Sequence, residues 1–149
     1  MPTIEIRDTI DAPSEKVFAI FADLEHAQEN IDSIIGMEML TDGPVGKGTR
    51  WRETRKMFGK EATEEMWISD WRPGSGYTVD CESCGCSYVT DISFTPSGAG
   101  TEVVMSMRVK PLTFLARLMS PLSLLFAGTF KKCMKKDIDD LRKKLISVS

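Results

Sequence analysis

The sequence predicts an α+β fold in which a curved antiparallel β-sheet of six to seven strands wraps around a long C-terminal α-helix, with one or two short helices after the first strand. Three observations lead to this prediction. An alternating segment at the start of the chain is followed at once by a helical pattern. Several more alternating segments come next, and a long amphipathic helix ends the chain. Such a sheet and helix would leave room between them for an apolar molecule.

Length and composition fit one ordinary globular domain. The 149 residues are 42% hydrophobic and 28% charged, so the chain can bury a core without disulfides or metal, and we expect a single domain over residues 1–149. The net charge of -3 argues against nucleic acid as a partner, because phosphate binding requires a basic surface.

The N-terminal residues and the cysteines bear on the compartment. The first residues have neither the basic region nor the apolar region of a signal peptide. Four cysteines in a chain without an export signal are expected to be reduced thiols. We therefore expect a cytoplasmic protein.

The first elements follow from alternation and from helix-start residues. Residues 3–10 alternate between isoleucines and polar residues, which predicts a half-buried strand. Pro13, with acidic residues on both sides, indicates a helix start. Residues 25–33 are polar and are compatible with a short second helix, which contains the only histidine, His26.

Further strands are expected wherever alternation lies between turn signals. Glycine and proline clusters separate these segments at regular intervals, which indicates a meander in which each strand pairs with the next. The expected strands cover about residues 34–40, 48–57, 61–71, 76–83, 87–95 and 101–110.

The C-terminal region carries the strongest helical periodicity. Apolar residues recur every three or four positions from Leu112 to Leu145, and Pro121 should interrupt the run. We expect a short helix over about residues 111–119 and a long one over 121–146. Residues 112–128 are apolar, but they contain Arg117 and Pro121 and are shorter than the ~20 residues that a membrane span requires. We expect them to cover or gate the space under the sheet, with transient membrane contact as an alternative.

Several short motifs occur in this order along the whole chain. They are APSEKVF over 12–18 with ADL over 22–24, GPVGKGTRWR over 43–52, RP over 72–73, GTE over 100–102 and the long terminal helix. With them the chain resembles the START-like superfamily and, within it, the polyketide cyclase/dehydrase and lipid-transport group (SRPBCC), whose fold is called helix-grip. The resemblance implies a hydrophobic or amphipathic ligand between sheet and helix, without implying catalysis.

The segment around residues 49–57 supplies the first candidate residues. Trp51 makes one face the better candidate for the interior, so Glu53 and Arg55 should also point inward. A buried carboxylate requires a partner, which Arg55 or a neighbouring strand could supply. Glu53 is then either a polar anchor or general base for a ligand, or an ion-pair partner at the end of the sheet.

The other strands should also turn one face toward the terminal helix. Flexible methionines suit a pocket that adapts to variable apolar ligands, although any single Met also suits ordinary core packing. The predicted ligand-binding residues are Trp51, Glu53, Tyr77, Cys81, Tyr88, Met105, Met107, Leu115, Met119 and Phe126.

A metal site or a catalytic histidine is not expected. The cluster Cys81, Cys84 and Cys86 offers three thiols, whereas a zinc site needs four ligands, so we predict no metal and no cofactor. His26 has no assignable nucleophile or orienting carboxylate, so an exposed position is expected.

These observations favour binding or transport of a small hydrophobic or amphipathic molecule, lipid- or polyketide-like, by a monomer or homodimer. The alternative is a polyketide cyclase or dehydratase in which Glu53, Arg55, Tyr77 or Tyr88 transfers protons. A third hypothesis is an interaction module that uses the basic outer side of the terminal helix.

Overall fold

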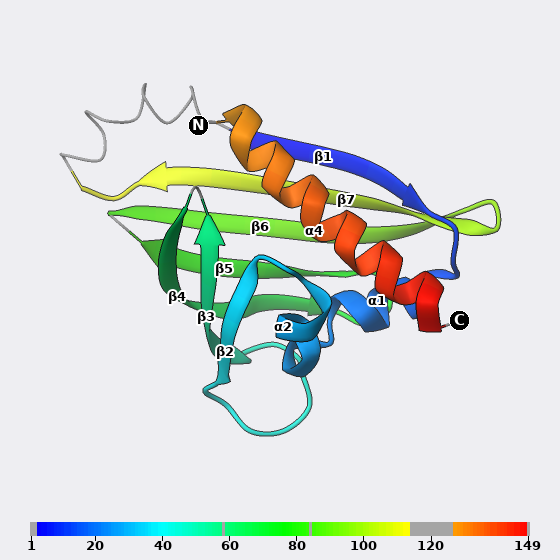
Figure 1. The fold of residues 1–149 in the computed structure, drawn as a ribbon, viewed down its shortest axis with the longest axis horizontal. Coiled ribbons are helices and arrows are strands. Elements are labelled where there is room, and N and C mark those ends of the chain that lie inside the picture. Colours follow the sequence, from blue (N-terminus) through cyan, green and yellow to red (C-terminus); the bar gives the residue numbers. More distant parts are fainter. Residues whose placement is uncertain (1–2, 58, 84, 114–126, 149) are drawn as a thin grey trace.

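An antiparallel sheet forms the frame of the protein in the computed structural model, which describes residues 3–57, 59–83, 85–113 and 127–148 (Figure 1). In these residues the sheet has seven strands in the order β1-β7-β6-β5-β4-β3-β2. The strands are β1 (Thr3–Ile10), β2 (Ile34–Met39), β3 (Arg50–Met57), β4 (Lys60–Arg72), β5 (Gly76–Ser83), β6 (Cys86–Ser97) and β7 (Gly100–Pro111). From β2 to β7 each strand pairs with the next, as the turn signals predict.

Short helices connect β1 to β2, and a long helix follows the sheet. They are α1 (Ser14–Phe21), η1 (Leu24–His26), α2 (Ala27–Asn30) and α4 (Ala127–Val148). Figure 1 shows α4 crossing the sheet diagonally, from the start of β1 toward α1, and α4 contacts β1, α1 and α2. The observed architecture is the expected helix-grip arrangement.

The apolar side of α4 packs toward the sheet as its periodicity predicts. Met134, Ile138, Leu141 and Leu145 are all buried. No helix of the described ranges is long and apolar enough to span a membrane.

One boundary prediction is wrong. The helix expected from about residue 111 does not begin there, because Pro111 is the last residue of β7 and neither Leu112 nor Thr113 is helical. Proline fits this position because the last residue of a strand need not donate a backbone hydrogen bond to a neighbouring strand. The rest of that predicted helix and the interruption at Pro121 fall in residues 114–126, which lie outside the described residues. The predicted gate over 112–128 falls largely in the same range and stays a prediction.

An aromatic cluster closes the α1 end of the sheet. Phe18 and Phe21 of α1 make edge-on contacts with Phe94 of β6, and Phe18 also meets Trp71 and Tyr77. The Tyr77 hydroxyl donates to the carbonyl oxygen of Phe21 at 2.9 Å and so satisfies a backbone acceptor at the end of α1.

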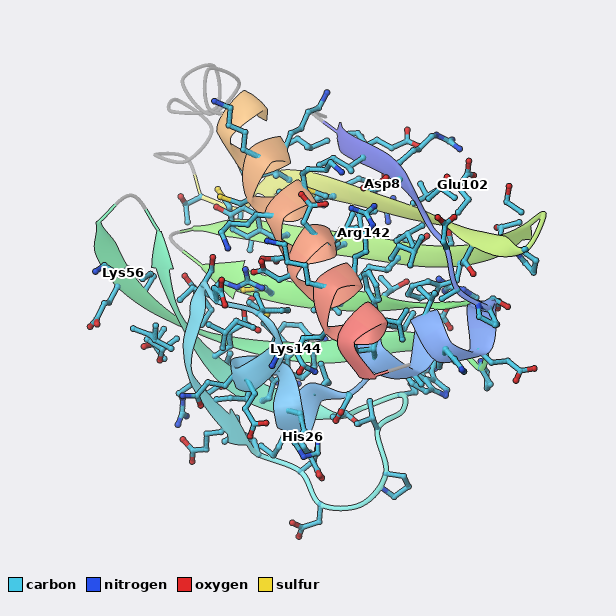
Figure 2. The ribbon with its side chains drawn as sticks, turned by 45° about the vertical axis from the view of Figure 1, so that its right-hand side comes forward. Asp8, His26, Lys56, Glu102, Arg142 and Lys144 are labelled. Carbon is cyan, nitrogen blue, oxygen red and sulfur yellow. The ribbon has the colours of Figure 1, made fainter. Side chains whose placement is uncertain are left out.

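Ion pairs hold α4 against the edge strand β1. Arg142 Nη2 lies 2.6 Å from Asp8 Oδ2 (Figure 2). Lys135 also donates to Asp8. Burial raises the pKa of Asp8, but the hydrogen bonds from the two cations outweigh it and bring that pKa to about 2. This carboxylate is therefore charged and paired near neutral pH.

Candidate functional site

The inner face of β3 carries the polar part of the candidate site. Trp51 and Glu53 are buried, and the Arg55 side chain is 22% exposed. These three residues share a face because side chains alternate along a strand. The bulky indole belongs to the buried core, and its position carries Glu53 and Arg55 inward with it.

A chain of polar contacts runs from this strand to α4. Trp51 Nε1 donates to Glu53 Oε1 at 3.1 Å, and Arg55 Nε donates to Glu53 Oε2. Arg55 Nη1 donates to Asp137 Oδ2 at 2.8 Å. We call Trp51, Glu53, Arg55 and Asp137 the polar network. It links the sheet to the helix, and its arginine is held by two carboxylates.

The second oxygen of Asp137 is buried without a hydrogen-bond partner among the described residues. Burial raises the pKa of Asp137, against the lowering effect of Arg55. Burial lowers the pKa of Arg55, but the two carboxylates of Glu53 and Asp137 raise it by more than burial lowers it. The net shift is upward, so Arg55 remains a cation. The network can therefore offer a hydrogen-bond acceptor to a bound molecule but carries no spare positive charge.

Asp137 is the member that the sequence analysis missed. It lies three residues after Met134 and four before Leu141, so it falls on the apolar side of the helix. An acidic residue on a buried helical stripe, together with an inward-facing arginine on a strand, is the signal that could have revealed it.

On strands β5 to β7 the same inner face carries a set of side chains that are only half-buried. They stand in register on the central strands: Thr90 is opposite both Val79 and Met107, and Tyr88 is opposite Val109. Central strands of a sheet covered by a helix are expected to be fully buried. Solvent therefore reaches this part of the inner face. The half-buried residues are Val79, Tyr88, Thr90, Met105 and Met107.

The predicted ligand-binding residues fall into four groups. Met105, Met107 and Tyr88 belong to the half-buried set, and Trp51 and Glu53 to the polar network. Tyr77 and Cys81 are buried on the same face. Leu115, Met119 and Phe126 lie outside the described residues. Ligand contact by any of these residues remains a prediction.

Tyr77 and Cys81 are poorly placed for proton transfer or nucleophilic chemistry. The Tyr77 hydroxyl already donates to Phe21, and burial raises the pKa of Tyr77. Burial, with a smaller effect from Glu64 and Glu53, raises the pKa of Cys81 to about 12. Both side chains are therefore neutral near pH 7.

Cys133 of α4 lies close enough to the polar network for Asp137 and Arg55 to act on its thiol, whereas His26 lies apart in the helical segment after α1. Cys81, Cys86 and Cys133 are free thiols, and Cys84 lies outside the described residues. In the part of the chain that the structure describes, no three His, Cys, Asp or Glu residues are grouped so as to hold a metal. The exposed His26 has its Nδ1 atom 2.9 Å from Asp23 Oδ1, and this contact raises its pKa.

Solved structures share this fold. The Thermus thermophilus protein TTHA0849 superposes with a TM-score of 0.82 at 19% identity over 99% of both chains. Ara h 8.0201 superposes with a TM-score of 0.79 at 16% identity over 98% of both chains. A START superfamily protein from Mycobacterium smegmatis superposes with a TM-score of 0.78 at 14% identity over 99% of both chains. At these identities the likeness concerns the fold alone.

The sequence itself matches a family model. No curated protein matches the chain significantly. The model of the family described as polyketide cyclase / dehydrase and lipid transport matches residues 1–145, which is almost the whole chain. The chain therefore belongs to the polyketide cyclase / dehydrase and lipid transport family.

Proposed function

We propose that this protein binds a small amphipathic molecule between the inner face of the sheet and α4, with the apolar body on the half-buried residues and the polar end at the polar network. The observation that carries this proposal is the partial exposure of Val79, Thr90 and Met107 on central strands that face the helix. When a ligand covers apolar side chains that water reaches, the removal of their surface from water favours binding.

The chemistry of the surface supports an apolar ligand body. Flexible methionines can adapt to ligands of different shape. Ligand sites combine apolar walls with a few placed polar groups. The inner face offers both kinds of group, with Met105 and Met107 on β7 and the Arg55–Asp137 pair between β3 and α4. The family description includes lipid transport, which agrees with a carrier role.

The proposed site can be tested by filling it. Met107→Trp adds bulk to the inner face of β7, whereas Ser106→Trp adds the same ring one residue earlier on the outer face. Binding of decanol is measured by isothermal titration calorimetry. We expect Met107→Trp to weaken binding by about tenfold or more, and Ser106→Trp to leave it within about twofold.

Two controls make this result interpretable. Circular dichroism should show that both variants are folded, and native mass spectrometry of the purified protein should show whether an apolar compound is already bound. Equal binding by both variants and the wild type would place the ligand elsewhere and contradict the proposal.

A further inference from the structure

The charge of the polar network restricts what can bind beside it. Arg55 is the cation that the inner face of β3 contributes, and it donates to Glu53 and to Asp137. With both carboxylates ionised, the network carries one positive charge against two negative charges. If Asp137 binds a proton, the network is neutral. In neither state does it have a net positive charge to pair with an anion.

A third carboxylate occupies the same face. Glu64 of β4 stands directly opposite Glu53 in the β3–β4 register, and residues paired in this way project to the same side. Both glutamates raise the pKa of the Cys81 thiol, after the larger effect of burial, so both act on the same part of the inner face. This part of the inner face thus carries the carboxylate of Glu64 in addition to the two that hold Arg55.

Asp137 supplies the complementary feature. Its Oδ1 atom is a buried acceptor without a hydrogen-bond partner among the described residues, while Oδ2 accepts from Arg55. An unsatisfied buried acceptor is costly, and a donor hydroxyl could relieve that cost after a small movement of the side chain. An anionic oxygen could not satisfy the ionised form of Asp137 in this way, because it has no proton to donate.

From these observations we infer that the site selects neutral hydroxylated amphiphiles and rejects those with a carboxylate or phosphate head group. This inference rests on the proposed function and adds the chemical class of the ligand. The arginine that would ordinarily hold an anionic head group is already occupied by the protein's own carboxylates. A carboxylate placed beside them would meet like charge in a partly desolvated setting.

The test compares two probes with the same alkyl chain, decanol and decanoate, by isothermal titration calorimetry with wild-type protein at about pH 7, where decanoate is ionised. We expect decanol to bind about tenfold or more tightly than decanoate. Decanoate binding as tightly as decanol would overturn the inference and leave the proposed function intact. Binding of neither probe would overturn both.

A variant tests whether the network is the cause. Asp137→Asn removes one carboxylate at constant shape, so the affinity for decanoate should rise and the ratio of the decanol affinity to the decanoate affinity should fall about fivefold or more. Asp139→Asn is the matched control, because Asp139 is on the same helix but pairs with Lys135 and Arg142. An equal effect of both variants on decanoate would contradict a role for the network.

Discussion

Arg55 of β3 and Asp137 of α4 join the sheet to the helix through one 2.8 Å hydrogen bond, although 82 residues separate them in the sequence. The same guanidinium holds Glu53, which is buried. A charge that is partnered inside a protein contributes little net stability, but its removal leaves the partners uncompensated.

Replacing Arg55 with Met should therefore destabilise the fold strongly. Both Glu53 and Asp137 would lose their cation in a buried setting, so we expect the free energy of unfolding to fall by about 3–5 kcal/mol in urea titrations. The control is Arg52→Met, on the outer face of the same strand, where the exposed pair with Glu38 should be worth less than about 1 kcal/mol. Similar losses in both variants would mean that the polar network is not a stabilising unit.

The network also shows what a sequence can predict of such a site. Alternation along β3 predicts that Glu53 points inward with Trp51, because the side-chain period of a strand is two residues. It does not predict Asp137, because the partner comes from a helix whose position over the sheet depends on the packing of the whole fold. The family motifs predict the architecture but do not specify this contact.

Tyr77 shows a second limit. Its ring was expected on the inner face, and it is buried there in the aromatic cluster. Its hydroxyl donates to the carbonyl of Phe21. This hydrogen bond depends on where α1 ends against the sheet, and no local sequence pattern predicts the position of that helix end. Similarly, strand β7 continues to Pro111 because β6 offers a pairing partner as far as Cys86, which helical periodicity after residue 111 does not reveal.

The contact of Asp8 with Arg142 and Lys135 should appear in the pH dependence of stability. Because the pKa of Asp8 is lowered from 3.8 to about 2 on folding, its contribution is fully present above about pH 4 and is lost as the pH falls toward 2. Asp8→Asn should lower the free energy of unfolding by about 1 kcal/mol near neutral pH and reduce the steepness of acid destabilisation in this window.

Urea titrations at a series of pH values measure this effect. Glu5→Gln is the control, because Glu5 lies on the same strand but pairs with the exposed Arg7. If Asp8→Asn and the wild type lose stability in parallel between pH 4 and pH 2, the pairing with α4 does not stabilise the fold.

Removing the Tyr77 hydroxyl should have a smaller and more local effect. Tyr77→Phe keeps the ring among Phe18, Trp71 and Phe94 but leaves the Phe21 carbonyl without this donor, so we expect a loss of about 1–2 kcal/mol. Tyr77→Leu also removes the ring contacts and should cost clearly more. Hydrogen exchange should show faster opening of the last turn of α1 in Tyr77→Phe, and unchanged exchange there would argue against the capping role.

Gly76 should be intolerant of any side chain, although its backbone conformation does not demand glycine. A Cβ atom at this position would lie 2.4 Å from the carbonyl oxygen of Ile92 and 2.9 Å from Arg72 Nη2, which itself donates to Asp91 at 2.7 Å. The first of these neighbours is backbone, so β5 would have to move away from β6, and we expect Gly76→Ala to cost about 1–3 kcal/mol. Gly46→Ala is the matched control, because no atom lies within 4 Å of its added Cβ, and it should change stability by less than about 0.5 kcal/mol. Thermal and urea unfolding would measure both, and a Gly76→Ala variant as stable as Gly46→Ala would show that the start of β5 can move away from β6 at little cost.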